Sequence, residues 1–319
     1  MRKVVSTENM SHEDWLAWRK KGIGGSDASV ILGISPFKST LELWNEKVQD
    51  ILETSEESEA AYWGHKLEAV VREEFTSRTG LRVYTEPYLL QHIQYPFMQA
   101  NLDGVIYDAV YGNCIFEAKT ASAYKASDWA DGVPDEYNAQ LQHYMAVTGY
   151  HGAYIAALIG GNKFVWKFVE RDKPYIRELI RKEKLFWTHV ETETPPPVDG
   201  TKTTAAFLDS CFPLAEDKEV LQLDVDEWQW VELYQDAKEK EKTAKEQKQL
   251  AENRLKALMQ KHEKATLHGA EISWQEIQSE KFDSKQLRRD EPEVYEQYAY
   301  KVQYRKFSVK QQKGAGKDE

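Results

Sequence analysis

The chain has 319 residues, of which 41% are hydrophobic and 30% charged, and its formal net charge is −11. Its two cysteines are too few for a disulfide framework, a four-cysteine iron–sulfur site or a zinc ribbon, so we expect a protein of the reducing cytoplasm. The N-terminus lacks the apolar stretch of a secretory signal. The sequence contains no run of about 18 apolar residues, so we expect no membrane-spanning helix. The negative charge does not exclude nucleic acid, because a channel can be locally basic and bound cations can neutralise carboxylates.

Residues 1–194 alternate helical and extended patterns. A serine cap, an apolar stripe or a terminal glycine marks most of the helices. Alternating apolar residues bounded by turn residues mark the strands. This order predicts an α/β domain with a mixed central sheet flanked by helices. The expected helices are 11–21, 39–49, 62–79, 135–148 and 172–191, with a polar, acidic loop at 50–60, and the expected strands are 82–93, 101–110, 114–120, 153–160 and 162–170.

The residue pattern of the sequence changes at the three consecutive prolines 195–197, which fit neither a helix nor a central strand. We expect a linker over 195–224, followed by a C-terminal extension over 225–319. Residues 225–264 predict one long helix with few apolar residues in its middle, typical of a solvated helix or a weak coiled coil rather than a DNA-binding helix. Residues 268–310 predict a small mixed or strand-rich unit.

The stretch IFEAKT at 115–120 places an acid and a base in a strand. Side chains alternate along a strand, so Glu117 and Lys119 share one face. Asp103 begins the preceding strand, and a hairpin would bring it beside them. Two carboxylates can hold Mg²⁺, and a lysine can activate a water or offset negative charge. A buried Glu117–Lys119 salt bridge is the alternative.

Two further polar residues fall on inward helix faces. Glu68 projects along the apolar stripe of its helix, and Gln140 has Tyr137 and Tyr144 as its helical neighbours. A buried charge costs several kcal/mol unless it is paired or binds a metal. Both residues therefore point to a site beside the Asp103 hairpin, although two side chains that cap nearby backbone would give the same pattern.

The stretch GIGGSDAS at 22–29 predicts a helix that Ser26 caps, with free backbone N–H groups at its start. Gly24 and Gly25 allow close approach, and Arg19 lies on the preceding helix. An arginine beside a helix N-terminus suits a terminal phosphate. A capping serine and a surface arginine are the alternative.

The segment between the active strand and the 135–148 helix contains Tyr124, Lys125 and Trp129. These side chains suit contact with a DNA strand by stacking and charge. Packing against the domain explains them equally well.

These motifs carry a resemblance to a known family. Asp103 followed by Glu117-Ala118-Lys119 resembles the PD-(D/E)xK nuclease superfamily. Five ordered stretches over roughly residues 10–190 resemble the YqaJ-type viral recombinase family, which is related to the lambda-type alkaline exonuclease. These stretches are WRKKGIGGSDAS (18–29), GHKLEAVVREEF (64–75), NLDG (101–104), FEAK (116–119) and YNAQLQHYM (137–145).

The resemblance implies a restriction-endonuclease-like core and a metal-dependent 5′-to-3′ exonuclease acting on linear double-stranded DNA. It implies Mg²⁺ or Mn²⁺, two ions per active site, and 3′ single-stranded tails for a RecT- or Redβ-like annealing protein in phage recombination. Relatives assemble as ring-like trimers, so a homo-oligomer is expected. The C-terminal extension falls outside the resemblance.

The resemblance also assigns roles to residues. Asp103, Glu117 and the carbonyl of Ala118 become metal ligands, Lys119 the catalytic lysine, and Glu68 a second-metal or water-mediated ligand. Gln140 orients the lysine or the attacking water. Arg19 and Ser26 bind the 5′-phosphate of the DNA end. Leu102 replaces the proline of the superfamily motif, a position known to vary.

Two other functions stay open at this point. A DNA endonuclease of the same superfamily would not need the pocket at Arg19 and Ser26. A non-catalytic recombination scaffold would not need the complete set of five polar residues, namely Glu68, Asp103, Glu117, Lys119 and Gln140.

Overall fold

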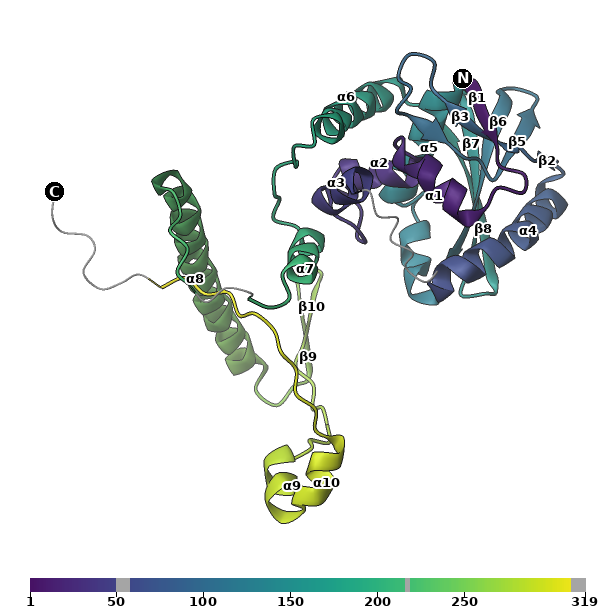
Figure 1. The fold of residues 1–319 in the computed structure, drawn as a ribbon. Helices are drawn as coiled ribbons and strands as arrows, with labels where there is room; N and C mark the ends of the chain where they lie inside the picture. The colour runs from purple at the N-terminus through teal and green to yellow at the C-terminus, as the bar shows by residue number, and fades with distance from the viewer. Residues whose placement is uncertain (50–57, 216–218, 311–319) are drawn as a thin grey trace. The chain divides into compact units, whose positions relative to one another are not determined.

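The computed structural model describes residues 1–49, 58–215 and 219–310 (Figure 1). Most of the acidic loop expected at 50–60 lies outside these ranges. The chain divides into two compact units, Met1–Cys211 and Phe212–Glu319. Each unit is described by itself.

The first unit is built on a five-stranded sheet with the order β2-β5-β6-β7-β8. Neighbouring strands within this sheet run antiparallel, except β6 and β7, which run parallel. A parallel pair needs a long crossover, and the connection here contains the 3-10 helix η1 (Ala123–Trp129) and α5 (Asp135–Thr148). The mixed central sheet flanked by helices was predicted correctly. The strands are β2 (Val83–Tyr84), β5 (Gly104–Asp108), β6 (Gly112–Ala121), β7 (Gly152–Ile159) and β8 (Lys163–Glu170).

Apolar side chains on the two faces of this sheet belong to two buried clusters. Phe75 of α4 (Glu59–Thr79) packs against Phe116, with ring centroids 5.0 Å apart. Leu141 of α5 belongs to the cluster of Ile115, which lies on the opposite face of β6. The 21-residue helix α4 begins at the Ser58 cap and ends at Gly80, whose φ of 73° is left-handed. The two helices therefore cover β6 from opposite sides.

A second layer of helices and a small sheet packs beside α5. It contains α1 (His12–Lys20), α2 (Gly25–Ile31), α3 (Thr40–Val48) and α6 (Lys173–Glu191), together with a small sheet of β1 (Arg2–Ser6), β3 (Tyr88–Gln91) and β4 (Gln99–Ala100). The strand expected at 82–93 is thus two strands in different sheets, because Pro87 separates them. β1 was not predicted.

A fully buried polar pair joins α5 to α6. Nδ1 of His143 lies 2.7 Å from Oε1 of Glu183, and Nε2 of His143 lies 2.8 Å from the carbonyl oxygen of Gln99. Burial disfavours the imidazolium, but attraction to Glu183 outweighs it and raises the pKa of His143. Burial likewise raises the pKa of Glu183. The hydrogen bonds of this pair therefore link α5, α6 and β4.

Helix α7 (Lys202–Cys211) closes the first unit. It lies within residues 195–224, the stretch expected as a linker. Thr204 is buried, and its hydroxyl donates to Asp199 at 2.7 Å.

The second unit has little core of its own. The 32-residue helix α8 (Trp228–Met259) is about 48 Å long at 1.5 Å per residue. Of the residues described in this unit, Met259 alone is buried. Within the described ranges, each helix is either too short or too polar to cross a bilayer. The remaining elements are η2 (Val225–Glu227), the hairpin β9 (Lys264–Leu267) and β10 (Ala270–Ser273), α9 (Ser284–Asp290) and α10 (Pro292–Tyr298).

Candidate active site

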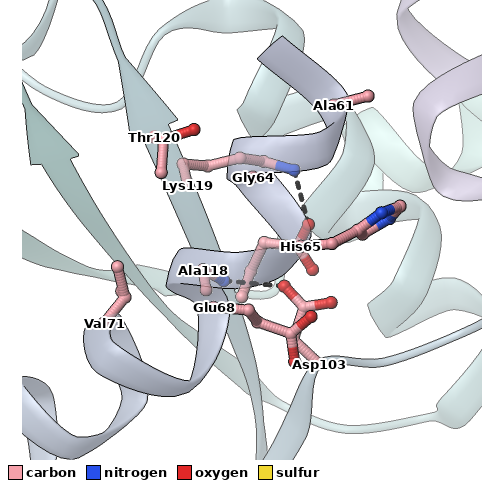
Figure 2. A pocket seen from close by; sticks show the side chains of 10 residues that line it. Ala61, Gly64, His65, Glu68, Val71, Asp103, Ala118, Lys119 and Thr120 are labelled. Carbon is pink, nitrogen blue, oxygen red and sulfur yellow. Dashed lines mark hydrogen bonds and ion pairs between the residues drawn. The ribbon is translucent and has the colours of Figure 1, made fainter. Parts of the chain in front are cut away.

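A polar pocket of about 270 Å³ lies where the second half of β6 faces the first half of α4 (Figure 2). Helix α4 and strand β6 supply most of its wall, and the residue before β5 supplies one carboxylate. In Figure 2 the carboxylates of Asp103 and Glu68 lie close together. The pocket is lined by Ala61, Gly64, His65, Glu68, Val71, Asp103, Glu117, Ala118, Lys119 and Thr120.

The β5–β6 hairpin places Asp103. Gly104 pairs with Phe116, so Asp103 comes level with the middle of β6. Its Oδ2 accepts a hydrogen bond of 2.8 Å from the backbone N–H of Ala118. A Cβ atom at Gly104 would lie 2.4 Å from Cγ1 of Val83, so the glycine is needed for the close approach of β2.

Glu117 is the most connected side chain of the pocket and is 3% exposed. Its Oε1 accepts hydrogen bonds from Nζ of Lys119 and from Nε2 of Gln140, each of 2.6 Å. Its Oε2 is buried and has no partner among the described residues. Glu117 and Lys119 do form the ion pair considered from the sequence, and the pair lies inside the pocket.

Gln140 enters from α5, behind the pocket. The amide Nε2 donates to Glu117 and also to the hydroxyl of Tyr144, one turn later, at 3.1 Å. Helical spacing explains this arrangement, because residues four apart share a face. The inward-pointing amide therefore holds the carboxylate of Glu117 rather than capping nearby backbone.

The charges of the pocket shift its pKa values in a consistent way. Burial first, and then repulsion from Glu117 and Glu68, raises the pKa of Asp103 well above its usual range. Burial also raises the pKa of Glu117. For Lys119, burial favours the neutral amine, but attraction to Glu117 and Asp103 outweighs it and raises the pKa. The ammonium of Lys119 therefore keeps its proton, and the carboxylates of Glu117 and Asp103 are harder to ionise than isolated ones.

Glu68 lines the pocket from α4, and its Oε1 lies 2.5 Å from a guanidinium nitrogen of Arg72. Within residues 1–49, 58–215 and 219–310, no three His, Cys, Asp or Glu side chains are already grouped as a metal site. The donor set nevertheless fits a hard divalent cation. Carboxylate oxygens are its preferred ligands, and Oε2 of Glu117 has no partner among the described residues. A cation would also relieve the repulsion from Glu117 and Glu68 that adds to the effect of burial on the pKa of Asp103.

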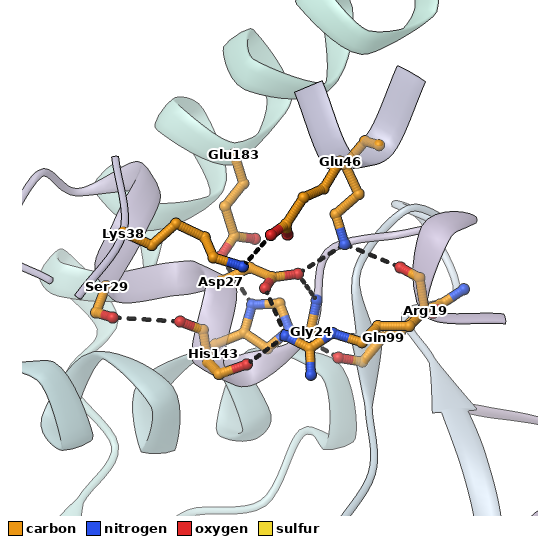
Figure 3. Close-up of polar contacts among 11 residues, drawn as sticks. Arg19, Gly24, Asp27, Ser29, Lys38, Glu46, Gln99, His143 and Glu183 are labelled. Atoms are coloured by element: carbon orange, nitrogen blue, oxygen red, sulfur yellow. Dashed lines mark hydrogen bonds and ion pairs between the residues drawn. The ribbon is translucent and has the colours of Figure 1, made fainter. Parts of the chain in front are cut away.

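The predicted phosphate-binding residues, Arg19 of α1 and Ser26 of α2, contact each other, and Figure 3 shows the side chain of Arg19 beside Asp27. A guanidinium nitrogen of Arg19 lies 3.1 Å from Oγ of Ser26 and 3.1 Å from Oδ1 of Asp27. Nζ of Lys47 lies 2.8 Å from Oδ2 of Asp27, and both of these side chains are buried. Burial opposes ionisation of Asp27, but Lys47 and Arg19 together hold its pKa below the usual range. The side chain of Arg19 stays 37% exposed.

The prediction that Ser26 caps its helix was wrong. Gly24 is the cap residue, and its N–H donates to Oδ2 of Asp27 at 3.0 Å. The spacing Gly-x-x-Asp is that of a capping box, in which an acid three residues into the helix satisfies the first N–H. Ser26 lies in the first turn, where its hydroxyl meets Arg19.

Helix α2, which carries Ser26 and Asp27, packs directly on α5, which carries Gln140. A Cβ atom at Gly25 would lie 2.4 Å from the ring of Tyr144 and 2.9 Å from Cγ of Gln140. The charges of both Glu117 and Arg19 act on Tyr144, whose pKa burial raises well above its usual range. Gly25 therefore serves the contact between α2 and α5.

The 120–134 segment divides between the two explanations considered from the sequence. Trp129 is buried and packs against Tyr137, with ring centroids 5.6 Å apart. Tyr124 is 96% exposed, and Lys125 is paired with Asp128 at 3.2 Å. Within the described ranges, the exposed ring of Tyr124 has no such packing or ion-pair contact.

Four residues of the site were not singled out from the sequence. His65 lines the pocket three residues before Glu68, a spacing that places both on one helix face. Thr120 follows Lys119 in the pocket wall. Asp27 and Lys47 are buried beneath Arg19, and no local pattern joins residues 20 positions apart.

Comparison with known proteins gives three kinds of match. A family model described as a YqaJ-like viral recombinase domain matches residues 14–151. The Bacillus subtilis (strain 168) protein named "Uncharacterized protein YqaJ" is 36% identical over 312 residues, covering 97% of each chain. The crystal structure of the alkaline exonuclease LHK-Exo of Laribacter hongkongensis is 23% identical and covers 57% of this chain and 94% of its own, with a TM-score of 0.49. A phage related exonuclease from Haemophilus somnus 129PT is 14% identical and covers 54% and 96%, with a TM-score of 0.42.

Proposed function

Because this chain belongs to the YqaJ-like viral recombinase family, we propose that it is a metal-dependent deoxyribonuclease. It degrades linear double-stranded DNA from 5′ to 3′ and leaves 3′ single-stranded tails. The observation that carries the proposal is the asymmetric environment of Glu117. Two donors hold Oε1, whereas the buried Oε2 has no hydrogen-bond partner among the residues that the structure describes.

An unpaired buried carboxylate oxygen is costly, and a group is expected to satisfy it. Asp103 and Glu117 with the Ala118 carbonyl would hold one Mg²⁺ or Mn²⁺, and Glu68 would serve a second ion directly or through water. When bound, such an ion supplies a more acidic water and polarises the scissile phosphate.

The protein's own residues contribute positioning and fixed charge. Lys119 keeps its proton, so it offsets the negative charge that develops on the phosphate during attack. Gln140 and Lys119 both hold Oε1 of Glu117, so among the described residues Oε2 is the oxygen left without a donor. Asp103 is oriented by the N–H of Ala118, which fixes one of its oxygens and leaves the other available.

Arg19 and Ser26 are the proposed receptor for the 5′-phosphate of a DNA end. Arg19 already bonds to Ser26 and remains partly exposed. Asp27 carries one negative charge between Arg19 and Lys47, so the cluster keeps one net positive charge. An arginine with a hydroxyl beside it suits a terminal phosphate.

The same proposal includes partners. We infer a single-strand annealing protein of the RecT or Redβ type as the recipient of the 3′ tails. We also infer assembly as a ring-like homotrimer, in which an acidic outside and a basic bore would reconcile the net charge of −11 with DNA binding.

A single digest tests the activity. Linear duplex labelled at the 5′ or the 3′ end, with and without 5′-phosphate, is incubated with Mg²⁺ or EDTA beside a covalently closed circle. Early release of mononucleotides from the 5′ label, with the circle intact, is the expected result. Cutting of the circle would identify an endonuclease, and no metal-dependent cutting would favour a non-catalytic scaffold.

A further inference from the structure

Residues 299–310, AYKVQYRKFSVK, form the last described stretch of the second unit. The sequence of this segment, which we call the basic-aromatic segment, contains four basic residues and no acidic one, although the whole chain has a net charge of −11. The basic residues are Lys301, Arg305, Lys306 and Lys310.

The aromatic rings of the segment are exposed. Tyr300 is 85% exposed, Tyr304 76% and Phe307 78%. Phe307 touches Tyr234 of α8 edge-on, with ring centroids 5.6 Å apart, and stays exposed nonetheless. Single exposed apolar residues are normal, but three large rings within eight residues mark an interaction site.

The cations of the segment differ from those of the neighbouring helix. On α8, Lys240 pairs with Asp236 at 2.6 Å and Lys245 with Glu241 at 2.5 Å. Among the described residues, the three lysines of the basic-aromatic segment have no ion pair, and Arg305 reaches only the carbonyl oxygen of Phe212 at 3.5 Å. Charge in the segment is therefore available to a negatively charged partner.

The backbone of the segment forms neither helix nor strand. Its sequence alternates Tyr300, Val302 and Tyr304 with Lys301, Gln303 and Arg305. In an extended chain such alternation places rings on one side and cations on the other.

We propose that the basic-aromatic segment binds single-stranded DNA. Single strands without sequence preference are held by aromatic side chains that stack on bases and by cations that follow the phosphates. The segment presents both groups in alternation over residues 300–305, followed by Lys306 and Phe307 in the opposite order, and it has no acid to repel a phosphate. That the strand is DNA, and that it is the 3′ tail left by cleavage, rests on the proposed function.

A protein partner that adds the segment to its sheet is the main rival. Such pairing draws on backbone hydrogen bonds and apolar pockets, so it does not require the four cations of this segment. The charge of the segment thus favours nucleic acid.

Fluorescence anisotropy of a labelled thymidine 30-mer with the full chain in EDTA tests the proposal without cleavage. The basic variant combines Lys301→Gln, Arg305→Gln and Lys306→Gln. We expect at least a tenfold loss of affinity and a salt slope smaller by about 2, because each neutralised phosphate contributes about 0.7 on single strands. The aromatic variant, Tyr300→Ser with Tyr304→Ser, should lose about tenfold per ring.

A matched control combines Lys240→Gln, Lys245→Gln and Lys256→Gln, three lysines of α8 that pair with acids. It removes equal charge and should keep wild-type affinity. Wild-type affinity in the basic and aromatic variants would overturn the proposal and assign the segment to a protein partner. An equal loss in the control, or a loss in the basic variant alone, would overturn it in favour of general electrostatic attraction. A parallel digest in Mg²⁺ separates the two proposals, because a chain that binds the 30-mer but cuts no duplex refutes the nuclease alone.

Discussion

The ammonium of Lys119 lies 2.6 Å from Oε1 of Glu117, its neighbour on the same face of β6. The pKa of Lys119 is raised in this setting once attraction to Glu117 and Asp103 outweighs burial. A lysine that keeps its proton serves as a cation rather than as a base. This relationship turns an ordinary strand triplet into a candidate for phosphodiester chemistry.

Lys119→Ala should lower the single-turnover rate of cleavage about 10³-fold or more, because it removes the cation expected to offset charge in the transition state. Duplex binding in EDTA, followed by anisotropy, should persist. Arg181→Ala is the control, since Arg181 lies in an exposed pair with Glu178 on α6. A wild-type rate in Lys119→Ala would remove the lysine from the mechanism.

Gln140 and Gln142 provide a matched pair on one helix. Gln140→Ala removes a donor to Glu117 and should lower the rate about 10²-fold. Gln142 instead bonds to the backbone of Glu170 and Asp172 at 2.9 Å each. Gln142→Ala should therefore cost about 1–3 kcal/mol of stability and spare the rate of the folded enzyme. Thermal unfolding and single-turnover rates of both variants check this, and equal rate losses would contradict it.

Arg19→Ala should reduce the preference for 5′-phosphorylated over 5′-hydroxyl ends to about one, because the remaining hydroxyl of Ser26 has no charge for a phosphate. Rates on the two substrates measure the ratio. Lys21→Ala, which removes a cation stacked on Trp18 at 4.4 Å, is the control and should keep the preference. An unchanged ratio in Arg19→Ala would place the end receptor elsewhere.

Gly25→Ala should destabilise the first unit by about 1–3 kcal/mol, since the added methyl meets the ring of Tyr144 at 2.4 Å. Displacement of Tyr144 and Gln140 should lower the cleavage rate as well. At Gly24 the nearest atom to an added Cβ is 3.8 Å away, so Gly24→Ala should be mild. Circular dichroism melts compare the two, and equal melting temperatures would refute the close contact.

The raised pKa of Asp103 predicts that the stability of the metal-free protein, measured in EDTA, depends on pH. Its pKa in the folded protein lies well above the usual value, so the folded state binds more protons than the unfolded state between the two values. Its contribution to stability is therefore lost as pH rises through that window. Asp103→Asn keeps an oxygen for the N–H of Ala118 and should gain about 2–4 °C in Tm at pH 8, about 1 kcal/mol for a unit of this size, and less at pH 5.

The control for this experiment is Asp209→Asn, which makes the same replacement at an exposed position of α7. Added Mg²⁺ should stabilise the wild type but not Asp103→Asn. A Tm difference that is independent of pH would show that Asp103 is not electrostatically strained.

The elements that position the pocket could be read from the sequence because each carries a local signal. Ser58, Gly80 and the stripe through Val71 and Phe75 mark α4, and α5 was predicted with its observed bounds. The period of two along β6 placed Glu117 and Lys119 together. The hairpin turn placed Asp103.

The rest depends on contacts between distant residues. The strand β1 is short and gains its partner β3 from more than 80 residues away. The pairing of Asp27 with Lys47, and of His143 with Glu183, follows from how α2, α3, α5 and α6 pack. No periodicity of a single segment encodes such a meeting, and the role of Gly25 likewise appears only once α2 lies on α5.

The contact at Gly25 has a consequence for product size under the proposed function. Arg19 and Ser26, which would hold the strand end, and Glu117, which would serve the cut, are joined through two helices with no room for another atom at their crossing. Under that function, the distance from the bound 5′ end of the strand to the scissile bond is then fixed by the packing of these helices. An enzyme with such a fixed distance would release fragments of one length at every step, whatever the base sequence.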